Sequence, residues 1–161
     1  MKTLSLILSA IFFTFHFCYL QTPPDPDDFY FQCKIDGRLY IPNSCANCLT
    51  FRILEDTSLI AGTNRGFETI RFGINDSTGI KNNKYELLNR GGMRVTYKNS
   101  TITDDYYRTQ NFNPGSLSIT EIDKANKTIR GSFHFVAYHS FRPNEGVIIT
   151  DGSFHVKYTT Y

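Results

Sequence analysis

The feature that most constrains the fold is a strict alternation of side chains in the last third of the chain, at residues 128–137. The members of one parity are apolar or small: Ile129, Gly131, Phe133, Phe135 and Ala137. Mostly polar side chains fill the other parity. A period of two held over the whole stretch places successive side chains on opposite faces of a strand and does not fit a helix. The stretch therefore predicts a half-buried β-strand.

Similar patterns recur along the chain, separated by turn residues. Residues 29–42 alternate on both sides of Asp36-Gly37, a pair that is a strong hairpin signal. Residues 84–88 fit either a strand or a single helical turn. The other strand candidates are 48–54, 58–63, 68–74, 93–98, 105–109 and 115–120.

A further strand is expected in the closing stretch, where one parity holds Ile148, Thr150, Phe154, Val156 and Tyr158. Asp151-Gly152 interrupts it and indicates a bulge or a tight turn. The chain also has 14 Phe and 10 Tyr, residues that suit a pleated, half-buried surface. We therefore predict a single all-β domain at 29–161, an antiparallel β-sandwich or barrel-like sheet of about eight to ten strands.

The N-terminal end carries an export signal. Residues 1–20 combine one cation, Lys2, with an apolar run, which is typical of a signal peptide and too short for a membrane-spanning helix. Residues 21–28 are rich in Pro and Asp and predict an extended linker. Cys18, directly after the apolar run, is a candidate for lipidation, although bulky residues precede it. The alternatives are cleavage near Leu20 with release of a soluble protein and, less favoured, retention of residues 1–20 as an uncleaved anchor.

Charge limits the classes of partner. Removing Lys2 from the 17 basic residues leaves 16, against 15 acidic residues. So small an excess argues against a nucleic-acid binder, because such a protein shows a basic patch.

Three cysteines lie in the predicted domain, namely Cys33, Cys45 and Cys48. An exported protein can form disulfides, and an odd number predicts one bridge and one free thiol. We favour Cys33 as one partner, with Cys45 or Cys48 as the other, and a Cys45–Cys48 bridge remains open. The Cys45–Cys48 spacing also suits redox or metal chemistry, but its setting between two strands does not.

The ends of the predicted domain resemble a known family. The chain has a GxLxIT strand, a DxxNK turn, an IxGxFxFxA strand and a terminal ITDGxFxVxY, at 115–120, 123–127, 129–137 and 149–158. This pattern is similar to that of small secreted proteins and lipoproteins of Bacteroidota grouped as a domain of unknown function. The resemblance implies an exported, often lipid-anchored, all-β domain with no assigned activity.

Few residues suggest chemistry. His134 and His155 could approach each other if their strands pair, but no third ligand is visible, so we expect no metal and no cofactor. Tyr106, Tyr107 and Tyr138 are the candidate binding residues, because exposed aromatic rings can stack on a sugar or fill a partner's pocket.

The sequence therefore predicts a non-catalytic, exported domain of the cell envelope that binds an envelope protein, a glycan or a small ligand. We expect it in the periplasm, at the outer membrane or secreted, contacting a membrane only through a lipid anchor. The first alternative is a small-ligand carrier with an apolar cavity in a closed barrel. The second is an envelope hydrolase, which a ring of titratable groups in one cleft would favour.

Overall fold

The computed structural model describes residues 29–45, 47–89, 94–99 and 106–161. The predicted signal peptide, the linker and Cys18 lie outside these ranges. All regular structure in them is strand, which confirms the all-β prediction. The strands are β1 (Tyr30–Ile35), β2 (Arg38–Tyr40), β3 (Leu49–Leu54), β4 (Ser58–Arg65), β5 (Glu68–Asn75), β6 (Lys84–Leu87), β7 (Arg94–Lys98), β8 (Tyr107–Arg108), β9 (Gly115–Asp123), β10 (Thr128–His139), β11 (Gly146–Lys157) and β12 (Thr159–Thr160).

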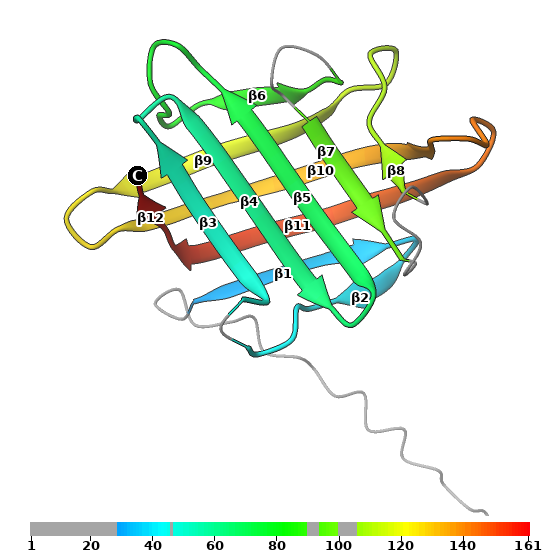
Figure 1. The fold of residues 1–161 in the computed structure, drawn as a ribbon, viewed down its shortest axis with the longest axis horizontal. Coiled ribbons are helices and arrows are strands. Elements are labelled where there is room, and N and C mark those ends of the chain that lie inside the picture. The colour runs from blue at the N-terminus through cyan, green and yellow to red at the C-terminus, as the bar shows by residue number, and fades with distance from the viewer. Residues whose placement is uncertain (1–28, 46, 90–93, 100–105) are drawn as a thin grey trace, which may run out of the picture.

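The strands form one curled sheet in two layers (Figure 1). β3, β4, β5 and β7 make one layer, and β9, β10, β11 and β1 cross behind them. The hydrogen-bonded order is β12-β3-β4-β5-β7-β8-β10-β11-β1-β2, with β9 on β10 and β6 on β9. Among the described strands, only the β12–β3 pair is parallel. The two-residue strands β8 and β12 bring the count to 12, above the expected eight to ten.

Local sequence explains the hairpins. Asp36 and Gly37 both have positive φ, 48° and 80°, as a two-residue type I′ turn between β1 and β2 requires. Residues 84–88, which the sequence left between a strand and a helical turn, contain β6, a strand paired with β9. This pairing is a tertiary contact that the local sequence does not show.

The layers are joined at several places. β8 pairs with β7 on one side and with β10 on the other. The chain passes from β11 into β12, which pairs with β3. At the β2 edge, Arg38 forms an ion pair with Glu68 of β5, and Arg65 donates to the carbonyl of Leu39. Just beyond β2, the backbone N–H of Asn43 donates to the carbonyl of Asn64 in β4.

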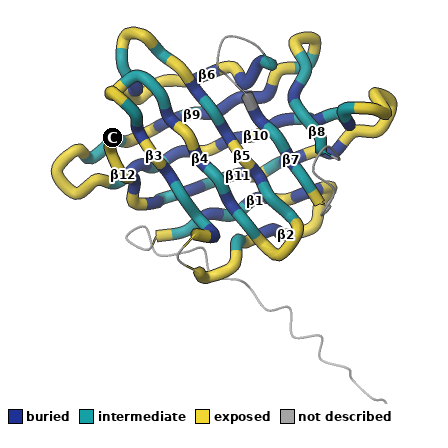
Figure 2. Tube along the Cα trace, viewed as in Figure 1, coloured by how far each residue is buried: buried dark blue, intermediate teal, exposed yellow. Residues whose placement is uncertain are grey.

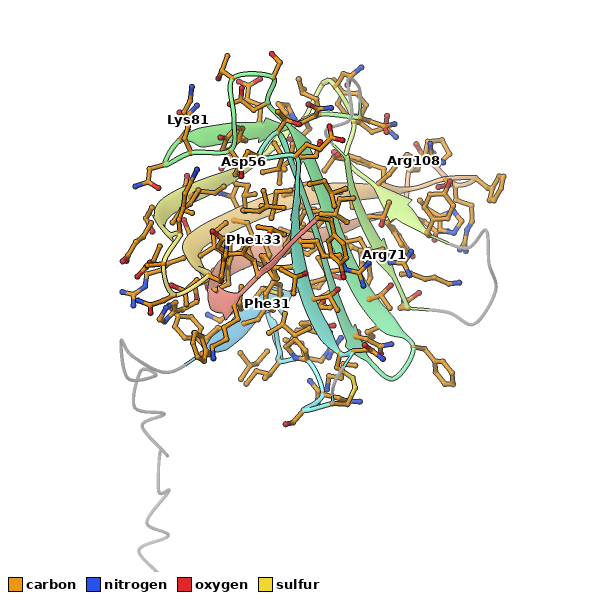
Figure 3. The ribbon with its side chains drawn as sticks, turned by 60° about the vertical axis from the view of Figure 1, so that its left-hand side comes forward. Phe31, Asp56, Arg71, Lys81, Arg108 and Phe133 are labelled. Carbon is orange, nitrogen blue, oxygen red and sulfur yellow. A yellow bond between two sulfur atoms is a disulfide. The ribbon has the colours of Figure 1, made fainter. Side chains whose placement is uncertain are left out.

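Phenylalanine rings fill the space between the layers, and we call Phe31, Phe72 and Phe133 the aromatic centre. The ring centroids of Phe31 and Phe133 are 5.2 Å apart, and those of Phe72 and Phe133 are 4.8 Å apart in an edge-to-face arrangement. Phe51 and Phe154 pack nearby at 5.1 Å. Figure 2 shows buried positions interspersed with less buried ones along the strands, and Figure 3 shows Phe31 and Phe133 between the layers.

The predicted bulge at Asp151-Gly152 is confirmed and changes the parity of β11. Phe133 pairs with Gly152 and Phe135 with Ile149, so two residues of β11 lie opposite one residue of β10. Asp151 adopts a φ of 51°. The inward parity therefore moves to Ile149 before the bulge, and Ile148 is 52% exposed. Placing Ile148 on the same face as Phe154 was wrong, because the extra residue reverses the alternation.

Candidate binding cleft

A cleft of about 660 Å³ opens between the β1–β2 hairpin, the beginning of β5, the end of β7, β8 and the β10–β11 connection. We call it the binding cleft. Its polar side chains are Asp36, Arg38, Glu68, Asn99, Asn144 and Glu145. Tyr97 and Tyr107 supply aromatic lining, and Ile35 and Val147 add apolar contacts. The volume lies within the range of about 300–1,000 Å³ typical of small-molecule sites.

Glu68 is the best-anchored polar group of the cleft. Its Oε1 atom accepts a hydrogen bond from the guanidinium of Arg38 and another, at 3.0 Å, from the hydroxyl of Tyr97. The Tyr40 hydroxyl also donates to the Glu68 carbonyl at 3.3 Å. Burial of the Tyr97 ring, with the Glu68 carboxylate beside its hydroxyl, raises the pKa of Tyr97 above its usual value. These bonds fix the carboxylate, and among the described residues its Oε2 atom has no hydrogen-bond donor.

Tyr107 forms a second wall. Its ring centroid is 5.8 Å from that of Tyr97 and 5.0 Å from that of His139, which it meets edge-to-face. His139 is held in turn, because its Nδ1 atom accepts the backbone N–H groups of Phe141 and Arg142. The described residues offer no hydrogen-bond partner to the Tyr107 hydroxyl, and its ring stays fixed by packing.

The structure brings the three predicted tyrosines to one junction but on two faces. In the β8–β10 pair, Tyr107 lies opposite His139 and Tyr138 lies opposite Arg108. Tyr107 lines the binding cleft. Tyr106 instead contacts Arg108, whose guanidinium lies 4.8 Å from its ring centroid, and Tyr138 packs on the exposed ring of Phe112 at 5.3 Å. Neither Tyr106 nor Tyr138 lines the cleft.

Sequence reasoning missed Arg38, Glu68 and Asn144. Arg38 and Glu68 are 30 positions apart and meet only because the β2 edge reaches the beginning of β5. Asn144 lies in a turn whose composition signals only a turn. No local pattern identifies these residues.

The disulfide joins Cys45 and Cys48, whose Cα atoms are 5.1 Å apart, and Cys33 is free. One bridge and one free thiol were expected, but Cys33 as a partner was wrong. Cys33 lies on the inward face of β1 and is 1% exposed, whereas Cys45 is exposed in the connection between β2 and β3. Burial raises the pKa of the Cys33 thiol to about 12, with Glu68 adding to the effect.

The two histidines considered as metal ligands do not meet. His134 is 3.3 Å from the hydroxyl of Ser116. In the β10–β11 pair His155 instead lies opposite Arg130, and its ring is 3.3 Å from that guanidinium. The described ranges contain no group of three or more His, Cys, Asp or Glu side chains that could hold a metal ion. In the same ranges, no helix has the length and apolar character needed to cross a membrane.

Comparison with protein families identifies a family that covers most of the chain. The model of a family described as Domain of unknown function (DUF6252) matches residues 27–156. This range includes the aromatic centre and every residue named in the binding cleft. Neither a curated protein nor a solved structure matches the chain.

Proposed function

The chain belongs to the family Domain of unknown function (DUF6252), and from this premise we propose that it is an exported, non-catalytic binding module of the cell envelope. The binding cleft carries the proposal, because it presents polar groups that lack a partner. These are the amides of Asn99 and Asn144 and the hydroxyl of Tyr107, none of which has a hydrogen-bond partner among the described residues. Convergent polar groups with aromatic walls are typical of ligand sites.

The location rests on the N-terminal sequence. An apolar run within residues 1–20 and a Pro/Asp-rich linker at 21–28 support export and a tether. We propose a Bacteroidota envelope protein that is lipid-anchored at Cys18 or released after cleavage near Leu20. Its place is then the periplasm, the outer membrane or the medium.

The small-ligand carrier is less well supported. Such a carrier needs an apolar cavity between the layers, where the ring of Phe133 instead packs on Phe31 and Phe72. Phe154 is fully buried and packs on Phe51. The polar binding cleft therefore accounts for ligand binding better than an apolar interior does.

A hydrolase is the second candidate, and one observation favours it. The cleft brings Asp36, Glu68 and Glu145 together with Tyr97, which is the ring of titratable groups that acid–base chemistry uses. A hydrolase would release new reducing ends from envelope glycans incubated with the purified protein, and a Glu68→Gln variant would lose that release. The binding module leaves the glycans intact.

The binding proposal is tested with a variant that fills the cleft. Asn144→Trp places an indole in the cleft, and Asn82→Trp is the matched control at another exposed asparagine, outside the cleft. An envelope extract of the native host should raise the Tm of the wild type and of Asn82→Trp but not that of Asn144→Trp. Equal shifts in all three proteins, or no shift in any, contradict binding at this cleft.

Export is tested separately by fractionation and intact-mass analysis in the native host. Lipidation predicts a membrane-bound chain that begins at Cys18 and carries acyl mass. Release predicts a soluble chain that begins near Gln21. An intracellular chain that retains residues 1–20 contradicts export.

A further inference from the structure

We infer that the ligand of the binding cleft is uncharged and polyhydroxylated, such as a short neutral oligosaccharide. This inference rests on the proposed binding function and specifies its ligand. Three properties of the cleft carry it: unpaired groups that suit hydroxyls, charges that are mostly paired, and a fixed tyrosine ring.

The unpaired groups offer both donors and acceptors. A side-chain amide has two N–H donors and a carbonyl acceptor, so Asn99 and Asn144 can each bond a hydroxyl in either direction. Glu68 adds the acceptor Oε2, and Tyr107 adds a hydroxyl. A sugar hydroxyl also donates and accepts, so vicinal hydroxyls can satisfy such a mixed set. A ligand with acceptors alone would leave Glu68 Oε2 unmatched, at a cost in affinity.

The charges of the cleft are largely paired within the protein. Arg38 is paired with Glu68, and Glu145 lies 3.2 Å from the guanidinium of Arg142. Asp36 is anchored by the backbone N–H of Ile148, which donates to its Oδ1 atom at 2.8 Å. The lining therefore offers no unpaired cation to an anionic ligand, and among the described residues Asp36 is its one carboxylate without an ion-pair partner.

The tyrosine wall suits the ring of a sugar. Tyr107 is partly buried and is held against Tyr97 and His139, so its ring is fixed before a ligand arrives. Aromatic rings with a polar tip contact apolar and polar groups of one ligand together. A sugar has this double character, with C–H groups on its ring faces and hydroxyls at its rim. Preorganisation of Tyr107 and Glu68 lowers the entropic cost of binding.

The test is a titration of the ¹⁵N-labelled mature protein followed by NMR, with defined probes. Cellotriose, triacetylchitotriose and mannotriose are the neutral probes, trigalacturonate is the anionic probe, spermidine the cationic probe and palmitate the apolar probe. We expect a neutral trisaccharide to shift the amide signals of Asn144 and Tyr107, with a Kd of about 1 mM or tighter, as a ligand of this size permits.

The variants Asn144→Ala and Tyr107→Phe each remove hydrogen-bonding groups from the cleft. Together they should weaken binding of the neutral trisaccharide about ten- to hundredfold, since each lost bond weakens it about three- to tenfold in the range of measured values. The matched controls Asn82→Ala and Tyr161→Phe change the same residue types at exposed positions outside the cleft and should leave the Kd unchanged.

The outcomes separate the ligand class from the function. Neutral saccharides that shift the cleft signals, with binding weakened only by the cleft variants, support the inference. Spermidine, trigalacturonate or palmitate binding at the cleft in their place overturns it and leaves the binding module standing. If no probe shifts the cleft signals, the inference is overturned, and the envelope-extract experiment with Asn144→Trp then decides the fate of the binding proposal.

Discussion

Phe133 and Glu68 belong to regions that the chain assembles in different ways. Phe133 reaches the aromatic centre because it alternates with polar neighbours along β10. Glu68 reaches the binding cleft because Arg38 and Tyr97, 30 and 29 positions away, converge on its carboxylate. The first region depends on burial of apolar area, and the second depends on directed polar contacts.

The difference predicts where the molecule tolerates change. Buried rings make many close contacts, so a substitution in the aromatic centre removes packing that nothing replaces. Polar groups at the cleft are partly hydrated, so a substitution there exchanges protein contacts for water at a smaller cost. Stability should therefore depend on the centre, and ligand binding on the cleft.

The largest expected effect is at the aromatic centre. Phe133→Ala should lower the free energy of unfolding by about 3–5 kcal/mol, because it leaves a cavity against Phe31 and Phe72. Urea denaturation followed by circular dichroism measures this change. Phe112→Ala is the control, because that ring is 77% exposed and its loss should cost less than about 1 kcal/mol. Equal costs for the two variants would show that the centre is not tightly packed.

Adding a methyl group to the interior should lower the free energy of unfolding by less than removing a phenylalanine ring does. A Cβ at Gly131 would lie 2.3 Å from the Ser118 carbonyl oxygen and 2.7 Å from the ring of Phe154, so Gly131→Ala should cost about 1–3 kcal/mol. Gly62→Ala is the matched control, because its nearest contact, Thr50 Oγ1, is at an ordinary 3.4 Å. Thermal unfolding of both variants compares them, and a Gly131→Ala variant as stable as Gly62→Ala would refute close packing between β9 and β11.

Alkaline pH should lower the stability of the folded protein through the buried thiol of Cys33, which lies beside the cleft. Cys33 has a pKa of about 12 in the folded protein and a usual value of 9.0, so the folded state keeps a proton that the unfolded chain loses. This stability is complete below about pH 9 and is lost as the pH rises towards 12.

Urea unfolding at pH 8 and pH 10 measures the loss. Between these values the wild type should lose about 1 kcal/mol more than Cys33→Ala does. Tyr40, whose pKa burial also raises to about 12, is present in both proteins. An equal loss in the two proteins would mean that the thiol ionises in the folded state.

The smallest effect belongs to the ion pair of the cleft. Arg38 and Glu68 have side chains 53% and 21% exposed, so their coupling should be about 0.2–1 kcal/mol. A double-mutant cycle with Arg38→Ala and Glu68→Ala measures it. A coupling as large as the cost of Phe133→Ala would contradict the distinction between the two regions.

The strands could be predicted because their signal is local. Turn residues such as Asp36-Gly37 and the alternation along β10 require only neighbouring residues, and the structure bears out both. The bulge at Asp151-Gly152 was also visible, but its consequence for Ile148 depends on how many residues of β11 face β10. That number is a property of the strand pair and does not appear in one strand.

The pairing of the cysteines could likewise be predicted only in part from local sequence. Their odd number predicted one bridge and one free thiol, and the structure agrees. The choice of partners depended on which thiol faces the interior. Cys33 shares the buried face of β1 with Phe31 and Ile35, so its thiol lies away from the loop that carries the bridge.

The sequence by itself determined the all-β class, the hairpins and the inward parity of most strands, because a period of two and turn chemistry act over a few residues. Tertiary structure decided the disulfide, the face of Ile148 and the binding cleft. The cleft needs the β2 edge, the beginning of β5 and the end of β7 to meet, and their contacts join residues 29 and 30 positions apart. Curling of the sheet supplies that proximity, and no local pattern encodes it.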